Sequence, residues 1–236
     1  MTGDEGDGRL RVTAVIICWN AGAELARLLD DLAGGRDSGL DLDVLVVDGG
    51  SGDGSVDMAR GRGVKVIGTE KCRGTQLRAG GRAATGDWLM FLHADTRLDA
   101  GWAAAVRRFA DDPDNRERAA VFGFALDDEC PAARRLEWLA AVRGSLLALP
   151  YGDQGLVIAR RFYEGLGGFK AMPLMEDVDM VRRIGRRRLV TLGAKALTSP
   201  RRYREGGYWR RPLLHLMCLS LYFLGVSPKR LAALYG

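Results

Sequence analysis

Two side chains that are able to bind a metal ion lie close together in the tripeptide His93-Ala94-Asp95. The tripeptide comes directly after the hydrophobic run 88–92, so both side chains stand at the end of an expected strand. A hard divalent cation is often held by one or two carboxylates together with the oxygens of a diphosphate. The spacing therefore suits a metal and diphosphate site, and an ordinary turn at a strand end is the competing interpretation.

A second polar turn, Asp48-Gly49-Gly50-Ser51, follows the apolar run 44–47. The Asp48 carboxylate can accept hydrogen bonds from a nucleotide base or ribose, and the glycines allow the backbone to come close to a ligand. Turns of this kind also occur for structural reasons alone. A third expected strand, 12–18, leads into Trp19 and Asn20, so three strands carry polar residues just beyond their ends.

These residues are positioned by alternating strands and helices. Apolar runs rich in β-branched residues predict strands, and leucines at helical spacing predict helices. In the first half the expected strands are 12–18, 44–47, 64–67 and 88–92, and the expected helices are 23–32, a short one through Met58, and 76–84. This alternation predicts an α/β fold with a mostly parallel sheet and helices on both faces. Ligands of such sheets bind beyond the carboxyl ends of the strands.

The second half of the chain is less regular. We expect strands at 119–126, 156–159 and 189–192, helices at 132–147, 162–166 and from Met175 to about 184, and an arginine-rich loop to Arg211. No linker divides the two halves, so we expect a single domain. Its expected parts are a disordered N-terminus (1–9), a half that binds a nucleotide (10–98), a half that supplies the acceptor side (99–211) and C-terminal apolar helices (212–236).

The composition is that of an ordinary globular protein, with 47% hydrophobic and 28% charged residues. The four cysteines are widely separated and form no C-x-x-C pair, which fits free thiols in a reducing cytosol. Residues 1–8 are acidic and glycine-rich, unlike a secretory signal. The longest apolar stretch, 213–226, is shorter than the roughly 20 residues of a spanning helix. We therefore expect a cytoplasmic protein in which this stretch is a buried or interfacial helix.

The positive charge is concentrated in one segment. Residues 176–211 carry eleven Arg or Lys against four Asp or Glu, a net charge of +7 within a chain of +5. Such a segment suits nucleic acid, anionic lipid or a phosphorylated substrate, and a solvated helix face is the alternative. No recognition motif accompanies it, so we expect no nucleic acid partner. With the apolar stretch it predicts salt-sensitive, peripheral contact through 201–226 at the inner membrane face. Assembly into a homo-oligomer stays open.

Four motifs, in order, resemble those of family 2 glycosyltransferases with the GT-A fold. They are Val15-Ile16-Ile17-Cys18-Trp19-Asn20, residues 46–54, residues 91–96 and Met175-Glu176-Asp177, and the resemblance covers roughly residues 11–235. More narrowly, residues 92–96, 151–154, 173–177 and 224–228 resemble the bacterial subgroup of arsenosugar-biosynthesis-type glycosyltransferases. The first strand-to-helix turn lacks G-x-G-x-x-G and the chain lacks a P-loop, which argues against a dehydrogenase and a P-loop protein.

The resemblance implies roles for individual residues. Asp48 matches the aspartate that recognises the nucleotide base, and Asp95 matches the second acid of the D-x-D motif, which holds Mn²⁺ or Mg²⁺ on the sugar-nucleotide diphosphate. His93 stands where the family usually has aspartate, and an imidazole next to ribose or metal would favour Mn²⁺. The other residues expected at the nucleotide sugar are Asn20, Arg73, Gln76, Ala94 and Arg202, the last of which lies in a relic of the Q-x-x-R-W motif.

Glu176-Asp177 resembles the acidic pair whose aspartate is the catalytic base. An acceptor hydroxyl must lose its proton as it attacks the anomeric carbon, and a carboxylate within hydrogen-bond reach can accept it. The diphosphate leaves from the opposite side with its charge neutralised, so one carboxylate suffices for inversion. The alternative is that both acids merely favour a helix N-terminus. Asp153 and Gln154 lie before an expected strand and are candidates for the acceptor site, with a plain turn as the alternative.

The resulting hypothesis is an inverting, metal-dependent glycosyltransferase that moves a sugar from a nucleoside diphosphate sugar to a small-molecule or lipid acceptor. A nucleotidyltransferase would need a G-x-G-x-R-type loop after the first strand, and Asn20-Ala21-Gly22-Ala23 does not supply it. A non-catalytic nucleotide-sugar-binding or peripheral membrane protein would not need both Asp95 and Asp177.

Overall fold

An eight-stranded sheet forms the centre of the structure, a computed structural model that describes residues 9–35, 39–126, 128, 130, 134–135, 152–198 and 210–235. The strands are β1 (Leu10–Cys18), β2 (Leu40–Asp48), β3 (Lys65–Gly68), β4 (Trp88–His93), β5 (Thr96–Leu98), β6 (Ala119–Leu126), β7 (Leu156–Ala159) and β8 (Leu189–Thr198). Three predictions lie wholly or mostly outside the described residues: the disordered N-terminus, the helix 132–147 and the placement of Arg202.

The order of the strands across the sheet is β3-β2-β1-β4-β7-β6-β8-β5. The first four strands in this order are all parallel. Beyond them, β7 runs antiparallel to β4 and β6, β8 runs parallel to β6, and β5 runs antiparallel to β8. The register pairs Cys18 with Asp48 and Ile17 with His93. The polar residues that follow β1, β2 and β4 therefore share one edge of the sheet, as the sequence predicts.

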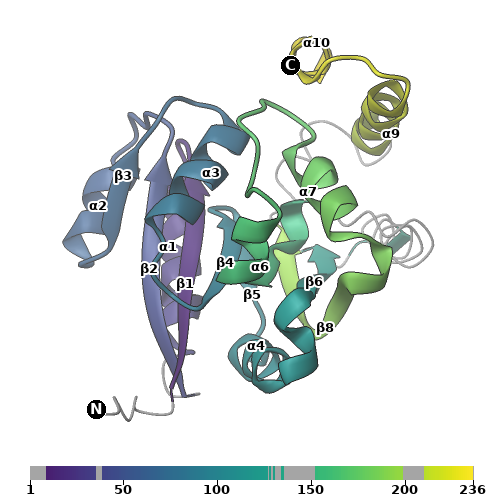
Figure 1. Ribbon diagram of the computed structural model, residues 1–236. Coiled ribbons are helices and arrows are strands. Elements are labelled where there is room, and N and C mark those ends of the chain that lie inside the picture. Colours follow the sequence, from purple (N-terminus) through teal and green to yellow (C-terminus); the bar gives the residue numbers. More distant parts are fainter. Residues whose placement is uncertain are drawn as a thin grey trace.

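Helices cover both faces of the sheet (Figure 1), which confirms the predicted α/β fold. They are α1 (Gly22–Ala33), α2 (Ser55–Gly61), α3 (Arg73–Ala83), α4 (Trp102–Asp111), α6 (Arg160–Gly165), α7 (Glu176–Ile184), α9 (Arg210–Phe223) and α10 (Pro228–Tyr235), with 3-10 turns η2 (Pro113–Glu117), η3 (Gly152–Gln154) and η4 (Arg186–Arg188). Leucines of α1 and aromatic residues of α4 pack on one face, and side chains of α3, α6 and α7 pack on the other.

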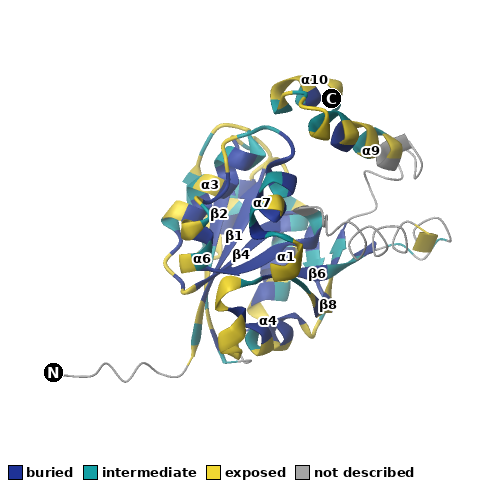
Figure 2. Ribbon diagram, turned by 45° about the vertical axis from the view of Figure 1, so that its right-hand side comes forward, coloured by how far each residue is buried: buried dark blue, intermediate teal, exposed yellow. Residues whose placement is uncertain are grey.

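The central strands β1 and β4 are buried on both faces over most of their length (Figure 2), and most of their residues are apolar. In β1, for example, Ala14 and Ile16 belong to the core under α1, while Val15 and Ile17 belong to the core under α3. His93 continues the alternation of β4 two residues after Phe91, which lies in the core on the α3 and α7 side. The pleat thus directs the His93 side chain towards α7.

The C-terminal residues form two helices, α9 and α10, which pack on α7. Cys218, Leu219 and Leu231 share an apolar cluster with Met175 and Val178. Both views place α9 and α10 at the opposite end of the molecule from α4 (Figures 1 and 2). Within the described parts of the chain, no helix combines the length and apolar character that crossing a membrane requires.

Candidate active site

The loops that follow β1 and β2 are tied to each other by side chains. Asn20 adopts a left-handed backbone with φ of 48°, which asparagine tolerates better than most residues. Its Oδ1 accepts a hydrogen bond from the Gly52 amide at 2.9 Å, and its own amide donates to Ser51 Oγ at 2.8 Å. The Gly22 amide, at the start of α1, donates to Asp53 Oδ2 at 3.1 Å. These bonds fix the shape of the sheet edge before any ligand binds.

Asp48 uses its carboxylate to order the second of these loops. Oδ2 accepts hydrogen bonds from the amides of Gly50 at 2.8 Å and Ser51 at 3.0 Å, and Oδ1 accepts one from Ser51 Oγ at 2.5 Å. The side chain is buried. Each carboxylate oxygen has more than one lone pair, so these contacts leave capacity for a ligand donor. Recognition of the nucleotide base by Asp48 stays a prediction.

Gln76 and Arg73 come from the first turn of α3 and have different surroundings. Gln76 is buried, and its Nε2 donates to the carbonyls of Cys18 and Val47, both at 2.9 Å, so it bridges the ends of β1 and β2. Burial lowers the pKa of the Arg73 guanidinium, but the charges of Glu176 and then Asp153, with smaller contributions from Tyr235 and Asp177, raise it overall. Arg73 is therefore the cation that faces the acidic residues of the second half.

His93, Ala94 and Asp95 form the end of β4 and the turn that follows it. The Ala94 amide donates to the carbonyl of Ile17 at 3.1 Å, which fixes the turn against β1. His93 is 8% exposed, and its Nδ1 lies 3.5 Å from Asp153 Oδ1. Asp95 is half-buried in the turn. The turn thus carries one carboxylate and one imidazole at the sheet edge.

The Asp95 carboxylate and the His93 imidazole fit a divalent cation only if a bound ligand supplies the rest of its coordination shell. No cluster of three or more histidine, cysteine, aspartate or glutamate side chains suited to a metal occurs among the described residues. Asp95 and His93 would supply only part of the coordination shell of such a cation, and a diphosphate together with water would have to supply the rest. The residues present are therefore compatible with a cation that arrives with a nucleoside diphosphate.

Asp153 and Gln154 lie in η3, the 3-10 turn that precedes β7. Because β7 runs antiparallel to β4, η3 comes to lie beside the carboxyl end of β4, where Asp153 meets His93. Gln154 is buried, and its Nε2 donates to the carbonyl of Phe122 at 2.9 Å. Among the described residues, its Oε1 has no hydrogen-bond partner. Asp153 faces the site, whereas Gln154 anchors the turn to β6.

Glu176 and Asp177 are the first two residues of α7. The preceding residue, Met175, has a left-handed φ of 66°, which is unusual for a residue other than glycine, and its side chain is buried in the cluster with α9 and α10. The Val178 amide donates to Asp177 Oδ1 at 2.7 Å. Both carboxylates thus lie at the positive end of the α7 dipole, as expected for acids in the first turn of a helix.

Glu176 is an unusually enclosed carboxyl group. It is 2% exposed, and its Oε2 has no hydrogen-bond partner within the described residues. Burial, followed by the charge of Asp177, raises the pKa of Glu176 to about 7, although Arg73 and His93 act in the opposite direction. Glu176 therefore changes its charge near neutral pH, where ordinary glutamates are fully ionised.

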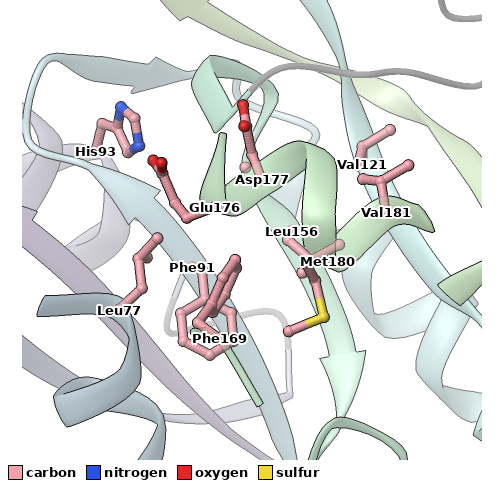
Figure 3. Close-up of a pocket in the computed structure, with 11 residues that line it drawn as sticks. Leu77, Phe91, His93, Val121, Leu156, Phe169, Glu176, Asp177, Met180 and Val181 are labelled. Atoms are coloured by element: carbon pink, nitrogen blue, oxygen red, sulfur yellow. The ribbon is translucent and has the colours of Figure 1, made fainter. Parts of the chain in front are cut away.

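His93, Glu176 and Asp177 line one pocket (Figure 3), which has an empty volume of about 430 Å³ and opens to solvent. The Glu176 side chain points towards His93, and Asp177 points away from the apolar residues that line the pocket (Figure 3). The remaining walls are mainly apolar and come from α3, β4, β6, β7, α7 and the loop before α7, with Leu77, Phe91, Val121, Leu156, Phe169, Met180 and Val181 among them. The structure thus brings together two of the sequence motifs that lie more than eighty residues apart.

One contact at the sheet edge was not expected from the sequence. The ammonium of Lys71 lies 3.0 Å from the centre of the Trp19 ring, a cation–π contact between the loops after β1 and β3. Trp19 is among the few large hydrophobic side chains that are exposed. Trp19, an aromatic residue directly after the expected strand 12–18, was the signal in the sequence that could have indicated this contact.

Comparison with known proteins agrees with this geometry. Residues 13–129 match the family described as Glycosyl transferase family 2. No sequence among the curated proteins matches the chain significantly. The matched segment runs from within β1 to just beyond β6 and includes Asp48, His93 and Asp95, while Glu176 and Asp177 lie beyond it.

Three solved structures illustrate the similarity in fold. Mannosyltransferase PcManGT from Pyrobaculum calidifontis, in complex with GDP-Man and Mn²⁺, is 22% identical with a TM-score of 0.66, over 96% of this chain and 68% of that one. Mannosyl-3-phosphoglycerate synthase from Rubrobacter xylanophilus is 18% identical with a TM-score of 0.62, over 92% and 75%. Glucosyl-3-phosphoglycerate synthase from Mycobacterium tuberculosis, in complex with Mn²⁺, UDP and glucosyl-3-phosphoglycerate, is 19% identical with a TM-score of 0.60, over 89% and 79%. At these identities the similarity establishes the predicted GT-A-type fold.

Proposed function

We propose that this chain, whose residues 13–129 belong to the Glycosyl transferase family 2, is an inverting glycosyltransferase that takes a sugar from a nucleoside diphosphate sugar. The observation that carries the proposal is the shared pocket of Glu176, Asp177 and His93. It sets an acidic pair beside the carboxyl end of β4, at the sheet edge where ligands of parallel sheets bind. Residues 10–98 would bind the donor, and 99–211 would supply the acceptor side.

The donor nucleotide would lie on the loops that follow β1 and β2. Asn20 and Asp48 accept hydrogen bonds that hold these loops in one conformation, so the loops would need little rearrangement when a ligand binds. Solved structures of similar fold contain GDP-Man or UDP with Mn²⁺, which supports a nucleoside diphosphate sugar as the donor class. Asp95, with His93 beside it, would hold Mn²⁺ or Mg²⁺, which neutralises charge on the departing diphosphate.

The acceptor hydroxyl would be activated by Asp177. This carboxylate lines the pocket and points away from its apolar walls (Figure 3), and the Val178 amide donates to its Oδ1. The Asp177 carboxylate would take the hydroxyl proton as the acceptor attacks the anomeric carbon. Asp153, next to His93, would orient the acceptor, and Arg73 would balance the negative charge of the three nearby carboxylates. A single base on one side of the sugar gives inversion.

The narrower resemblance to the arsenosugar-biosynthesis-type subgroup, the cytoplasmic location and a homo-oligomeric state stay predictions. A nucleotidyltransferase or a non-catalytic binding protein is the alternative function. Neither alternative accounts for the buried Glu176 and the half-buried Asp177, which share a pocket with the end of β4.

Two substitutions separate donor binding from chemistry. Asp95→Ala should weaken metal-dependent donor binding and abolish turnover together, because the cation grips the diphosphate before and during its departure. Asp177→Asn keeps the size and polarity of the side chain but cannot accept a proton. Donor affinity should therefore survive in Asp177→Asn while sugar transfer falls by roughly 10²–10⁴-fold.

The measurements are calorimetric binding of nucleoside diphosphates with Mn²⁺, and mass spectrometry of reactions with a panel of nucleoside diphosphate sugars. Donor hydrolysis without an acceptor would reveal the preferred base and sugar. Transfer by Asp177→Asn at nearly the parental rate would move the base to Asp179 or Asp153. If no donor binds in the presence of either metal, the proposed function is wrong.

A further inference from the structure

Exposed apolar side chains are concentrated on the two C-terminal helices. Leu213, Leu216, Met217, Phe223 and Leu224, in α9 and the turn after it, are 62%, 52%, 44%, 50% and 80% exposed, and Leu234 in α10 is 55% exposed. Trp19 is the seventh large hydrophobic residue with comparable exposure among the described residues. We call the six C-terminal side chains the α9–α10 face. Such a concentration on one surface marks an interaction site.

The α9 helix is apolar on two sides, and only one side is covered. Leu216 and Met217 lie three and four residues after Leu213, and Phe223 and Leu224 each lie seven residues after one of that pair, so the five positions form a single stripe. The buried positions Cys218 and Leu219 lie between the exposed ones in sequence and pack with Val178 and Val181 of α7. Burial against the body of the protein therefore explains one side of α9, and the stripe needs another partner.

Positive charge surrounds this face. Residues 206–236 contain no Asp or Glu, but they contain Arg210, Arg211, Lys229 and Arg230. Lys229 and Arg230 are exposed on α10, and the guanidinium carbon of Arg182, an exposed residue of α7, lies 5.3 Å from the centre of the Phe223 ring. An apolar stripe with a cationic rim matches the boundary between acyl chains and anionic headgroups. A second copy of the chain would bring the same cations against each other.

The buried side of α9 and α10 packs next to the candidate active site. Leu174 and Met175, which precede the acidic pair, belong to the same apolar cluster as Cys218 and Leu231. Tyr235, the last residue of α10, is close enough to Arg73 to influence its pKa. The two helices that carry the α9–α10 face therefore lie against the start of α7, which bears the acidic pair.

We propose that the α9–α10 face docks on a membrane that contains anionic lipid, and that the acceptor is an alcohol carried by that membrane. The second part rests on the proposed function. The sequence places membrane contact at 201–226, and the face extends it through α10 to Leu234. Docking would hold the Asp177 carboxylate next to hydroxyl groups at headgroup level, so a lipid acceptor would not need to leave the bilayer.

Binding is tested by sedimentation with vesicles of phosphatidylcholine, alone or mixed with phosphatidylglycerol. The full chain should bind the mixed vesicles only and should be released by high salt. Leu224→Glu should weaken this binding roughly tenfold or more, because it puts an acid into the apolar stripe beside anionic headgroups. The matched control is Ala104→Glu, which adds the same charge at an exposed position of α4, at the other end of the molecule.

Three results would overturn the docking surface. The first is no binding of the parent chain to mixed vesicles, and the second is an equal loss of binding in Leu224→Glu and Ala104→Glu. The third is a dimer in light scattering that Leu224→Glu dissociates, since the face would then bind a second copy.

The acceptor is tested with labelled donor and vesicles that contain diacylglycerol, alongside a panel of water-soluble alcohols. Label should enter the organic phase, and Leu224→Glu should lower this transfer roughly tenfold while donor hydrolysis in solution stays unchanged. Label that enters only soluble alcohols overturns the lipid acceptor. Absence of donor hydrolysis in every variant overturns the proposed function instead, and vesicle binding is measured independently of it.

Discussion

Several side chains at the candidate site hold the surrounding backbone in place. Asp48 and Asn20 accept hydrogen bonds from backbone amides in the loop after β2, and Gln76 donates hydrogen bonds to carbonyls at the ends of β1 and β2. Glu176 and Gln154 are exceptions, because each has a buried side-chain oxygen with no hydrogen-bond partner among the described residues. Ionisation of a carboxyl group buried in this way lowers the stability of the fold, and such groups are concentrated at functional sites.

The cost at Glu176 should depend on pH. Burial raises its pKa from 4.5 to about 7 in the folded chain. Well below pH 4.5 the carboxyl is protonated in the folded and unfolded states alike, so its burial carries no ionisation cost there. As pH rises towards 7 the unfolded chain ionises first, and folding loses up to about 3 kcal/mol. Glu176→Gln should therefore be more stable than the parent chain by up to about 3 kcal/mol at pH 8 and by little at pH 4.

Urea unfolding at pH 4, 6 and 8 measures this difference. Glu164→Gln, which removes one acid from an exposed position of α6, is the control and should show no comparable trend. A gain for Glu176→Gln that is the same at all three pH values would mean that Glu176 is not held in its neutral form.

His93 offers a second test at this scale. If His93 lies next to the cation, His93→Asp should retain donor binding and shift the preference from Mn²⁺ towards Mg²⁺, because oxygen replaces nitrogen. Titration of both metals against donor hydrolysis measures the preference, with Asp153→Asn as the control for loss of the neighbouring charge. An unchanged preference would place His93 outside the metal shell and leave it as the partner of Asp153.

The chemistry of these side chains was easier to predict than their partners. Asp95, Glu176 and Asp177 were found because they sit in short motifs beside apolar runs. The contact between His93 and Asp153 was not, since it depends on the antiparallel pairing of β4 with β7, whose residues are far apart in sequence. No local pattern encodes such a pairing.

Among the elements, α3 approaches the sheet closely at Gly80. A Cβ at Gly80 would lie 2.2 Å from Val15 Cγ1 and 3.0 Å from Val47 Cγ2, so only glycine allows the helix to come this near. The approach lets Gln76, one turn earlier, reach the carbonyls at the ends of β1 and β2. The helix thus helps to set the spacing of the loops that follow β1 and β2.

Gly80→Ala should therefore destabilise the fold by about 1–3 kcal/mol, the usual cost of extra volume in a packed core. The matched control is Gly61→Ala in α2, where an added Cβ meets nothing within 4 Å. This change should be neutral or should stabilise by up to about 1 kcal/mol, because alanine restricts the unfolded chain. Urea unfolding of both variants at one pH decides the matter, and equal effects would rule out the close approach.

Elements with strong apolar character were predicted well. β6 and β7 have the bounds 119–126 and 156–159 expected from sequence. The strand expected at 189–192 continues to Thr198 because Ala194, Ala196 and Thr198 alternate towards the core, and such small residues give a weak hydrophobic signal. For the same reason α4, which is rich in alanine, was not predicted.

At the scale of the whole molecule, the sheet has two parts that differ in strand direction and in how far apart their neighbouring strands are in sequence. The strands β3, β2, β1 and β4 are parallel neighbours that occur early in the chain, and alternation of strands and helices predicts them. The part from β7 to β5 mixes directions, and its order follows from contacts between distant segments. The fold class was therefore predictable, whereas the arrangement around the acceptor side was not.

The strand order also has a consequence for synthesis on the ribosome. β6 lies between β7 and β8, and both of these strands are translated after it. A nascent chain that ends before β7 can already pair β1 to β4, but it carries an apolar strand with two open edges. Unpaired edges of this kind are the usual starting points of aggregation. The interval between translation of β6 and β8 is therefore when this chain most needs a chaperone, and pausing of the ribosome there would lower its yield.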